Sequence, residues 1–139
     1  MKLFMPIDTI VDSPPVPVLY IAGDRNMPIS EQAPLAVEQL ESSLVSLRGK
    51  KFYGVIVDGE YRACVRISSD EDIDHRKYLS FSIPGGRYVH RRLVNWDHEV
   101  ELIGQSVNEL IARPDYDSSR PVIEFYRSHT ELVIRVPVF

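Results

Sequence analysis

The chain has 139 residues, of which 44% are hydrophobic and 26% are charged, and its formal net charge is −4. This composition is typical of one globular domain with a hydrophobic core of its own. The arginines and lysines are scattered along the chain, which argues against a protein that binds nucleic acid through a basic surface.

Two further absences limit the class of protein. Cys64 is the only cysteine, so no internal disulfide can form. The N-terminal segment lacks the apolar run of a signal peptide, and no segment approaches the length needed to span a membrane. We therefore expect a cytoplasmic protein with no membrane partner.

The first half of the chain begins with a segment whose structure the sequence leaves open. Residues 1–13 could form an extra edge strand or a loose arm before the prolines of "DSPPVPV". Residues 18–23, "VLYIAG", are typical of a strand. Pro34 then suits a helix N-terminus, and Gly49 suits a helix end.

An amphipathic helix is predicted between these two residues, because apolar side chains recur at steps of three and four. These side chains are Val37, Leu40, Leu44 and Leu47. Asp58-Gly59 follows as a tight turn, which predicts a hairpin between residues 51–58 and 62–69.

The second half repeats this order of elements. Residues 78–83 and 87–94 are predicted strands, and Asn95 or Asp97 can cap a second helix. The apolar residues of that helix have the spacing of the first: Val100, Ile103, Val107 and Leu110. Residues 121–126 and 131–138 then form a second pair of strands.

The repeated order predicts an α+β fold of two βαββ units related by a pseudo-twofold axis. Each unit alone would leave one face of its sheet uncovered, and packing the two units together buries it. We expect one domain over residues 1–139, with pseudo-repeats at about 14–69 and 78–138. Two helices should cover one face of an antiparallel sheet, with a groove between the repeats where a ligand could bind.

Glu124 is the residue that most suggests chemistry, because it lies in the apolar strand "VIEFY". Strand periodicity places Ile123 and Phe125 on one face, which we expect to face the helices because it is purely apolar. Glu124 would then lie on the opposite face beside Tyr126. It is either a pocket carboxylate or an ordinary exposed residue paired with Arg127 or Arg135.

Aromatic residues could supply the walls of such a pocket, because tyrosine combines a flat ring with a hydroxyl that can orient a ligand. The tyrosines of the predicted strands include Tyr20, Tyr53, Tyr61, Tyr88 and Tyr126. Trp96 either staples the second helix or covers the groove. The four histidines have no metal-ligand spacing, so neither a metal nor a cofactor is expected.

The second half resembles the GyrI-like small-molecule-binding family, also called the bacterial effector-binding domain. The resemblance rests on three groups of residues, Ile83-Pro84 with Tyr88, Pro121 with Glu124 and Tyr126, and Ile134 with Pro137-Val138. It implies a duplicated βαββ fold with an aromatic pocket between the repeats and a central glutamate, which is Glu124 here.

The resemblance leaves three functions open. The first is a stand-alone domain that binds flat hydrophobic or cationic molecules, such as xenobiotics or antibiotics. It would use Glu124 and aromatic side chains, which are Tyr126, Tyr88, Trp96, Tyr20, Tyr53 and Tyr61. The second is a hydrolase that opens the cyclopropane of DNA-alkylating natural products, with Glu124 as general base and Tyr126 or Tyr88 as proton donor to the substrate carbonyl. The third is an inhibitor whose partner is DNA gyrase.

Overall fold

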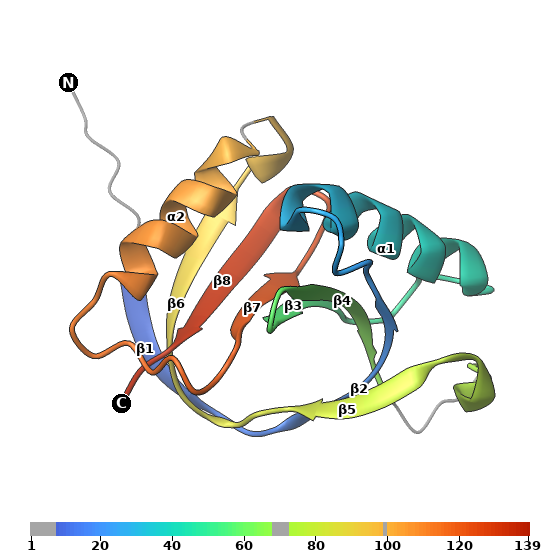
Figure 1. Cartoon of the computed structure of the whole chain (residues 1–139), viewed down its shortest axis with the longest axis horizontal. Coiled ribbons are helices and arrows are strands. Elements are labelled where there is room, and N and C mark those ends of the chain that lie inside the picture. Colours follow the sequence, from blue (N-terminus) through green and yellow to red (C-terminus); the bar gives the residue numbers. More distant parts are fainter. Residues whose placement is uncertain (1–7, 68–72, 99) are drawn as a thin grey trace.

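The computed structural model describes residues 8–67, 73–98 and 100–139 (Figure 1). The first half contains β1 (Asp8–Ser13), β2 (Val16–Ala22), α1 (Ile29–Ser43), β3 (Phe52–Val57) and β4 (Glu60–Arg66). The short 3-10 helix η1 (His75–Lys77) follows. The second half contains β5 (Leu79–Ile83), β6 (Gly86–Val94), the 3-10 helix η2 (Trp96–His98), α2 (Glu101–Ile111), β7 (Val122–Tyr126) and β8 (Glu131–Pro137).

The strands form one eight-stranded antiparallel sheet in the order β1-β6-β8-β7-β3-β4-β2-β5. Exchanging β1–β4 with β5–β8 gives the same order read backwards, so the strand order itself has a pseudo-twofold symmetry centred between β7 and β3. The duplicated α+β fold is therefore confirmed. The boundaries given above for the pseudo-repeats stay a prediction.

The leading strand of each half pairs with the other half. β1 pairs with β6, and β5 pairs with β2. Residues 8–13 are therefore an edge strand, which settles the alternative for this part of the N-terminal segment; residues 1–7 lie outside the described residues. This exchange ties the halves together beyond their central contact between β3 and β7.

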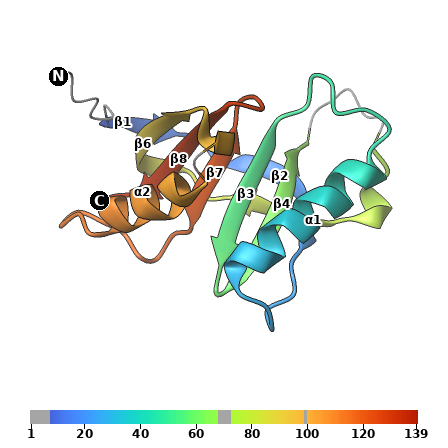
Figure 2. The same ribbon diagram turned by 90° about the horizontal axis from the view of Figure 1, so that it is seen from above.

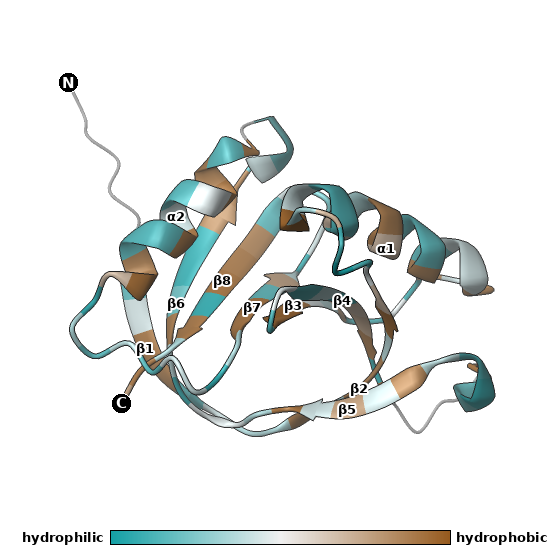
Figure 3. Cartoon of the chain, viewed as in Figure 1, coloured by the Kyte–Doolittle hydropathy of each residue, from teal (hydrophilic) through white to brown (hydrophobic). Residues whose placement is uncertain are grey.

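Both helices lie on the same face of the sheet, one on each half (Figure 2). α1 packs on β4 and β2, whereas α2 packs on β8 and β6. Hydrophobic residues are prominent along β8 and alternate with hydrophilic ones along both helices (Figure 3). The central strands β3 and β7 thus lie between the two helices.

The opposite face of the sheet is curled into a cup, with β2 and β5 running across its lower side in Figure 1. Buried side chains from five strands meet inside this cup and form a core that contains no helical residue: Val18, Tyr53, Val55, Ile83, Tyr88 and Ile123. Both faces of the central strands are therefore buried.

The predicted hairpin turn is confirmed, because Asp58 and Gly59 both have positive φ, of 49° and 78°. The predicted limits of α1 are wrong. The helix begins at Ile29, five residues before Pro34, and ends at Ser43. Pro34 lies on the exposed side of the helix, where water can bond the carbonyl freed by its missing amide hydrogen.

Two apolar residues assigned to the helices do not lie on their buried faces. Leu47 follows the end of α1 and is exposed, while Val100 precedes Glu101 and is 58% exposed. Neither Asn95 nor Asp97 caps α2. Asn95 instead has a φ of 58° and leads from β6 into η2, where its carbonyl accepts a hydrogen bond from the amide of His98.

Arg91 holds the edge strand in place. Its Nε and Nη2 donate to the two carboxylate oxygens of Asp8 in β1, at 2.8 and 3.0 Å, and its Nη1 donates to Glu109 of α2 at 3.0 Å. Its side chain is 10% exposed, whereas that of the adjacent Arg92 is 62% exposed.

We predict that Arg91→Gln lowers the free energy of unfolding by roughly 1–3 kcal/mol, because charge-assisted hydrogen bonds to two elements are lost. Arg92→Gln is the matched control and should cost less than about 1 kcal/mol, since its ion pair with Glu131 is largely exposed. Urea unfolding of the three proteins measures both values. Equal losses in the two variants would contradict this role of Arg91.

Candidate functional site

Glu124 lies at the centre of the sheet, on the face that carries the helices. β7 is a central strand, and Glu124 is paired in register with Gly54 of β3. The neighbouring residues Val122 and Tyr126, which share its face, pack with residues of α2. Glu124 is only 8% exposed, so it is a buried carboxylate rather than a solvated one.

Two tyrosine hydroxyls surround one oxygen of this carboxylate. Tyr126 donates to Oε1 of Glu124 at 2.7 Å, and Tyr61 of β4 donates to the same oxygen at 3.2 Å. The two hydroxyl oxygens are 3.1 Å apart, so the three groups form a closed cluster. Burial and the neighbouring carboxylate raise the pKa of both phenols, which keeps them neutral donors.

Burial also decides the protonation of the carboxyl group. Loss of hydration raises the pKa of Glu124, while the hydrogen bonds from Tyr126 and Tyr61 lower it, and the effect of burial is the larger one. In the described part of the chain, the groups that act on Glu124 are these two phenols, and no lysine or arginine is among them. Ionised Glu124 would therefore be a buried negative charge without a cationic partner among the described residues.

Gly54 provides the space that this cluster occupies. A Cβ at this position would lie 2.1 Å from the hydroxyl oxygen of Tyr61 and 2.8 Å from Oε1 of Glu124. The sequence contained a signal for this role, because a glycine inside a strand often marks a close approach of another group. Gly54 is a site residue that the sequence analysis did not single out.

Gln32 of α1 fixes the strand that carries Tyr61. Its Oε1 accepts a hydrogen bond from the amide of Tyr61 at 2.9 Å, and its Nε2 donates to the carbonyls of Met27 and Gly59 at 2.8 and 2.9 Å. The side chain is 1% exposed, and both its amide nitrogen and its amide oxygen are hydrogen-bonded. No sequence pattern indicates Gln32, because two of its partners are 27 and 29 residues away.

Trp96 lies next to the cluster and contacts Tyr126. The two ring centroids are 5.7 Å apart in an edge-to-face arrangement. Trp96 also packs against the apolar cluster under α2, to which Leu110 of that helix and Leu132 of β8 belong. Its Nε1 is buried and has no hydrogen-bond partner within the described residues.

The structure thus gathers four of the predicted residues in one place, namely Glu124, Tyr126, Tyr61 and Trp96. Tyr20, Tyr53 and Tyr88 lie in the core of the cup on the other face, so they cannot share a wall with Glu124. Tyr88 donates its hydroxyl to the carbonyl of Pro84, and Tyr53 stacks on Phe125 at 4.9 Å.

The predicted orientation of β7 is wrong. Ile123 and Phe125 face the cup, and Glu124 faces the side of the helices. The apolar character of Ile123 and Phe125 does not identify the face that carries the helices. The sheet curls so that its opposite face is buried too, and that face is also filled with apolar and aromatic side chains. The alternative of an exposed Glu124 paired with Arg127 or Arg135 is also excluded, since Arg127 pairs with Glu131.

A metal-binding cluster and a membrane-spanning helix are both absent from the described part of the chain. No three histidine, cysteine, aspartate or glutamate residues there lie close enough together to hold a metal ion. No helix there is long and apolar enough to cross a membrane. The cluster at Glu124 itself consists of one buried carboxylate and two phenols.

Comparison with known proteins shows the fold. No family model and no curated protein matches the chain. Solved structures match it along nearly its whole length. An integron cassette protein of Vibrio cholerae (VCH_CASS2) has a TM-score of 0.72 and 16% identity, and the match covers 95% of each chain.

Two further structures have the same fold. SAV2435, bound to tetraphenylphosphonium, has a TM-score of 0.63 and 14% identity over 96% of this chain and 94% of its own. A putative transcription regulation protein of Staphylococcus aureus has a TM-score of 0.55 and 13% identity over 96% and 97%. These matches confirm the fold that the resemblance to the GyrI-like family implied.

Gly54→Ala is expected to destabilise the protein by roughly 1–3 kcal/mol, because the new methyl group must displace the Tyr61 hydroxyl from a packed site. Gly104→Ala is the matched control. It lies in α2 with open space around it, so alanine should stabilise the helix by about 0.5–1 kcal/mol. Thermal unfolding distinguishes the two, and a stabilising Gly54→Ala would contradict the packing described here.

The raised pKa of Glu124 predicts a pH-dependent effect of Glu124→Gln on stability. The folded protein binds this proton more tightly than the unfolded chain does, so ionising Glu124 costs stability as the pH rises through its folded pKa. We expect Glu124→Gln to melt at a higher temperature than the native chain near pH 7. This difference should shrink as the pH falls toward about 4, where the unfolded glutamate is itself protonated.

The control for this experiment is Glu38→Gln, which changes an exposed glutamate of α1. It should leave the melting temperature unchanged across the same pH range. A Glu124→Gln variant that is less stable than the native chain at pH 7 would show that the carboxylate is stabilised, rather than penalised, by its surroundings.

Proposed function

We propose that this protein binds flat hydrophobic or cationic small molecules at Glu124, on the face of the sheet that carries the helices. The observation that supports this most is the buried carboxylate, which has no cationic partner among residues 8–67, 73–98 and 100–139. A bound cation would offset the charge of Glu124 at a position where water cannot. A buried ion gains most from a partner because the surroundings do not screen it.

The neighbouring rings suit the same class of ligand. Tyr126 and Trp96 present aromatic surfaces beside the carboxylate, and a cation on such a ring gains about 0.5–2 kcal/mol. SAV2435, which shares this fold, was solved bound to tetraphenylphosphonium, a hydrophobic cation with aromatic rings. That ligand class is therefore the first to test here.

Binding requires a side chain to move, because Glu124 is 8% exposed and Tyr61 is 1% exposed. Trp96 is the side chain proposed to move. It is half-buried and lies in η2 between β6 and α2. Its Nε1 makes no hydrogen bond to any described residue, so moving the ring breaks none there. Rotation of this ring away from Tyr126 would open a path to the carboxylate from the side of α2.

Hydrolysis of a strained cyclopropane is the second candidate, and one observation favours it. Burial raises the pKa of Glu124, which makes the carboxylate a better proton acceptor at neutral pH. The hydroxyl of Tyr126, 2.7 Å from that carboxylate, could donate to a substrate oxygen that gains charge.

Mass spectrometry of a cyclopropane-bearing alkylator incubated with the protein tests this second candidate. The water adduct should form faster with the native chain than in buffer, and with Glu124→Gln it should form no faster than in buffer.

For binding, we predict that tetraphenylphosphonium associates with the native chain and that Glu124→Gln weakens its affinity about tenfold or more, because the buried countercharge of Glu124 is removed. Affinity should also rise with pH through the raised pKa of Glu124, since a proton and the cation compete for the carboxylate. Isothermal titration calorimetry at several pH values measures both effects.

Glu38→Gln is again the matched control, and it should bind as the native chain does. Trp96→Ala separates access from recognition, because it should change the rate of association more than Glu124→Gln does. Equal affinity for tetraphenylphosphonium in the native chain and in folded Glu124→Gln would remove Glu124 from the binding site and overturn the proposal.

A further inference from the structure

A hollow lies on the other face of the sheet, inside the cup. Its volume is about 430 Å³, and it is lined by eight residues from the β3 side and from β6, β7 and β8: Lys50, Lys51, His90, Phe125, Tyr126, Arg127, Val133 and Arg135. Five of these carry basic side chains, and none is acidic. The hollow is therefore opposite in charge to the Glu124 cluster.

Arg135 is the centre of this hollow. It lies on β8 directly across from His90 of β6, and its guanidinium carbon is 4.8 Å from the centre of the Phe125 ring. Its Nε is buried without a hydrogen-bond partner in the part of the chain that the structure describes. A buried N–H of a charged group without an acceptor is costly, which suggests that a bound acceptor completes it.

His90 also has a buried ring nitrogen, Nε2, that lacks a hydrogen-bond partner among the described residues. Burial, together with the nearby charge of Arg135, lowers the pKa of His90 to about 4, so the ring is neutral at neutral pH. His90 and Arg135 are paired across the adjacent strands β6 and β8 and both line the hollow, so an anion bound there would lie beside both side chains.

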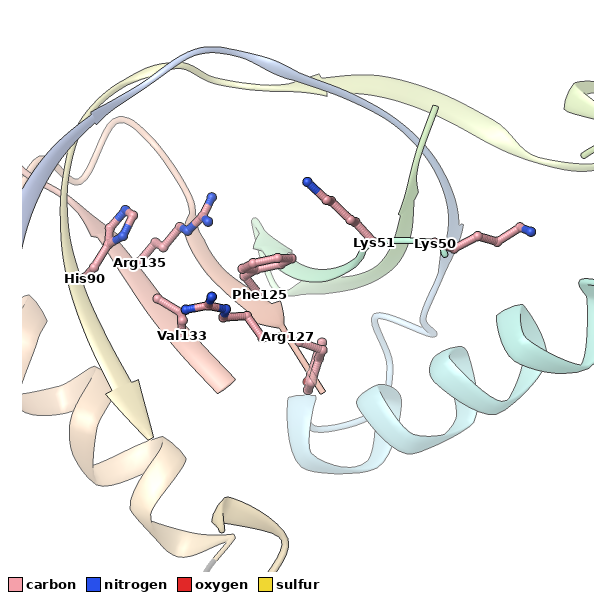
Figure 4. A pocket seen from close by; sticks show the side chains of 8 residues that line it. Lys50, Lys51, His90, Phe125, Arg127, Val133 and Arg135 are labelled. Atoms are coloured by element: carbon pink, nitrogen blue, oxygen red, sulfur yellow. The ribbon is translucent and has the colours of Figure 1, made fainter. Parts of the chain in front are cut away.

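The remaining residues define the shape of the ligand. Figure 4 shows Arg135, His90, Phe125, Val133 and Arg127 gathered on one side of the hollow, with Lys51 pointing toward them from the other side and Lys50 pointing away. Phe125 and Val133 give an apolar surface beside the guanidinium. A planar guanidinium pairs with a carboxylate through parallel hydrogen bonds, and a flat ring can stack on Phe125.

We propose that this hollow binds a planar aromatic carboxylate, with Arg135 on the carboxylate, Phe125 against the ring and Lys51 at the rim. The carboxylate site differs from that of the proposed function, because Glu124 faces the helices and Phe125 faces the cup. Tyr126 lies between the two sites, since it bonds Glu124 and also lines the edge of the hollow. The protein would therefore hold a cation and an anion on opposite faces of one sheet.

The test uses 2-naphthoate as the probe and titration calorimetry as the measurement. We expect binding to the native chain, and an affinity lower by about tenfold or more in Arg135→Gln. The neutral analogue 2-naphthamide should bind correspondingly more weakly to the native chain. Arg76→Gln is the matched control, since its side chain is 90% exposed and lies in η1, away from the hollow.

A second variant covers the case in which Arg135→Gln does not fold. Lys51 is exposed, so Lys51→Gln should fold and still weaken 2-naphthoate binding severalfold through the lost rim charge. In amide NMR spectra of the native chain, 2-naphthoate should shift Phe125, Val133 and Arg135.

Three results would overturn the proposal. The first is displacement of 2-naphthoate by tetraphenylphosphonium, which would place both probes in one site. The second is equal binding of 2-naphthoate and 2-naphthamide. The third is unchanged affinity in Lys51→Gln or in folded Arg135→Gln. None of these depends on the outcome of the Glu124→Gln experiment.

Discussion

A buried carboxylate held by two phenol hydroxyls is the constraint on which the centre of this structure depends. Glu124 lies between Tyr61 and Tyr126, and these bonds join strands β7 and β4, which β3 separates. The hydrogen bonds offset only part of the cost of burial, because the pKa of Glu124 stays raised. Gly54 on β3 is required between them, since any side chain there would occupy the place of the Tyr61 hydroxyl.

The duplicated fold places this cluster where the halves meet. Each helix covers its own half, and the central β3–β7 pair lies between the helices (Figure 2). Neither half alone contains the cluster, because Tyr61 and Gly54 come from the first half and Glu124 and Tyr126 from the second. The curled sheet also creates a separate, basic interior on its other face around Arg135. The carboxyl group of Glu124 and the guanidinium of Arg135 thus lie on opposite faces of one sheet.

Much of the fold could be predicted from the sequence because its signals are local. Asp58-Gly59 determines its own turn, and the apolar residues of both halves recur in the same order. The helix limits were predicted less well. Pro34 suits a helix start although it lies within α1, and Leu47 continues the apolar spacing of the helix past its end at Ser43.

The site was only partly predictable, since it depends on contacts between distant residues. Glu124 stands out as a carboxylate in an apolar strand, but its direction depends on how far the sheet curls. The apolar pair Ile123 and Phe125 fits either buried face, so alternation alone could not choose between them. Gln32 gave no signal, because its role arises from the packing of α1 on the β3–β4 turn.

The most direct test of this account is the ionisation of Glu124 itself. In protein labelled with ¹³C at the glutamate carboxyl carbons, the resonance that disappears in Glu124→Gln belongs to Glu124, and its titration gives the pKa of that group. The account predicts a pKa above the ordinary value of a glutamate, and a further rise in Tyr126→Phe, where one stabilising hydrogen bond to the carboxylate is lost. Titration together with the exposed glutamates, unchanged by Tyr126→Phe, would show that the carboxylate is hydrated and would contradict the account.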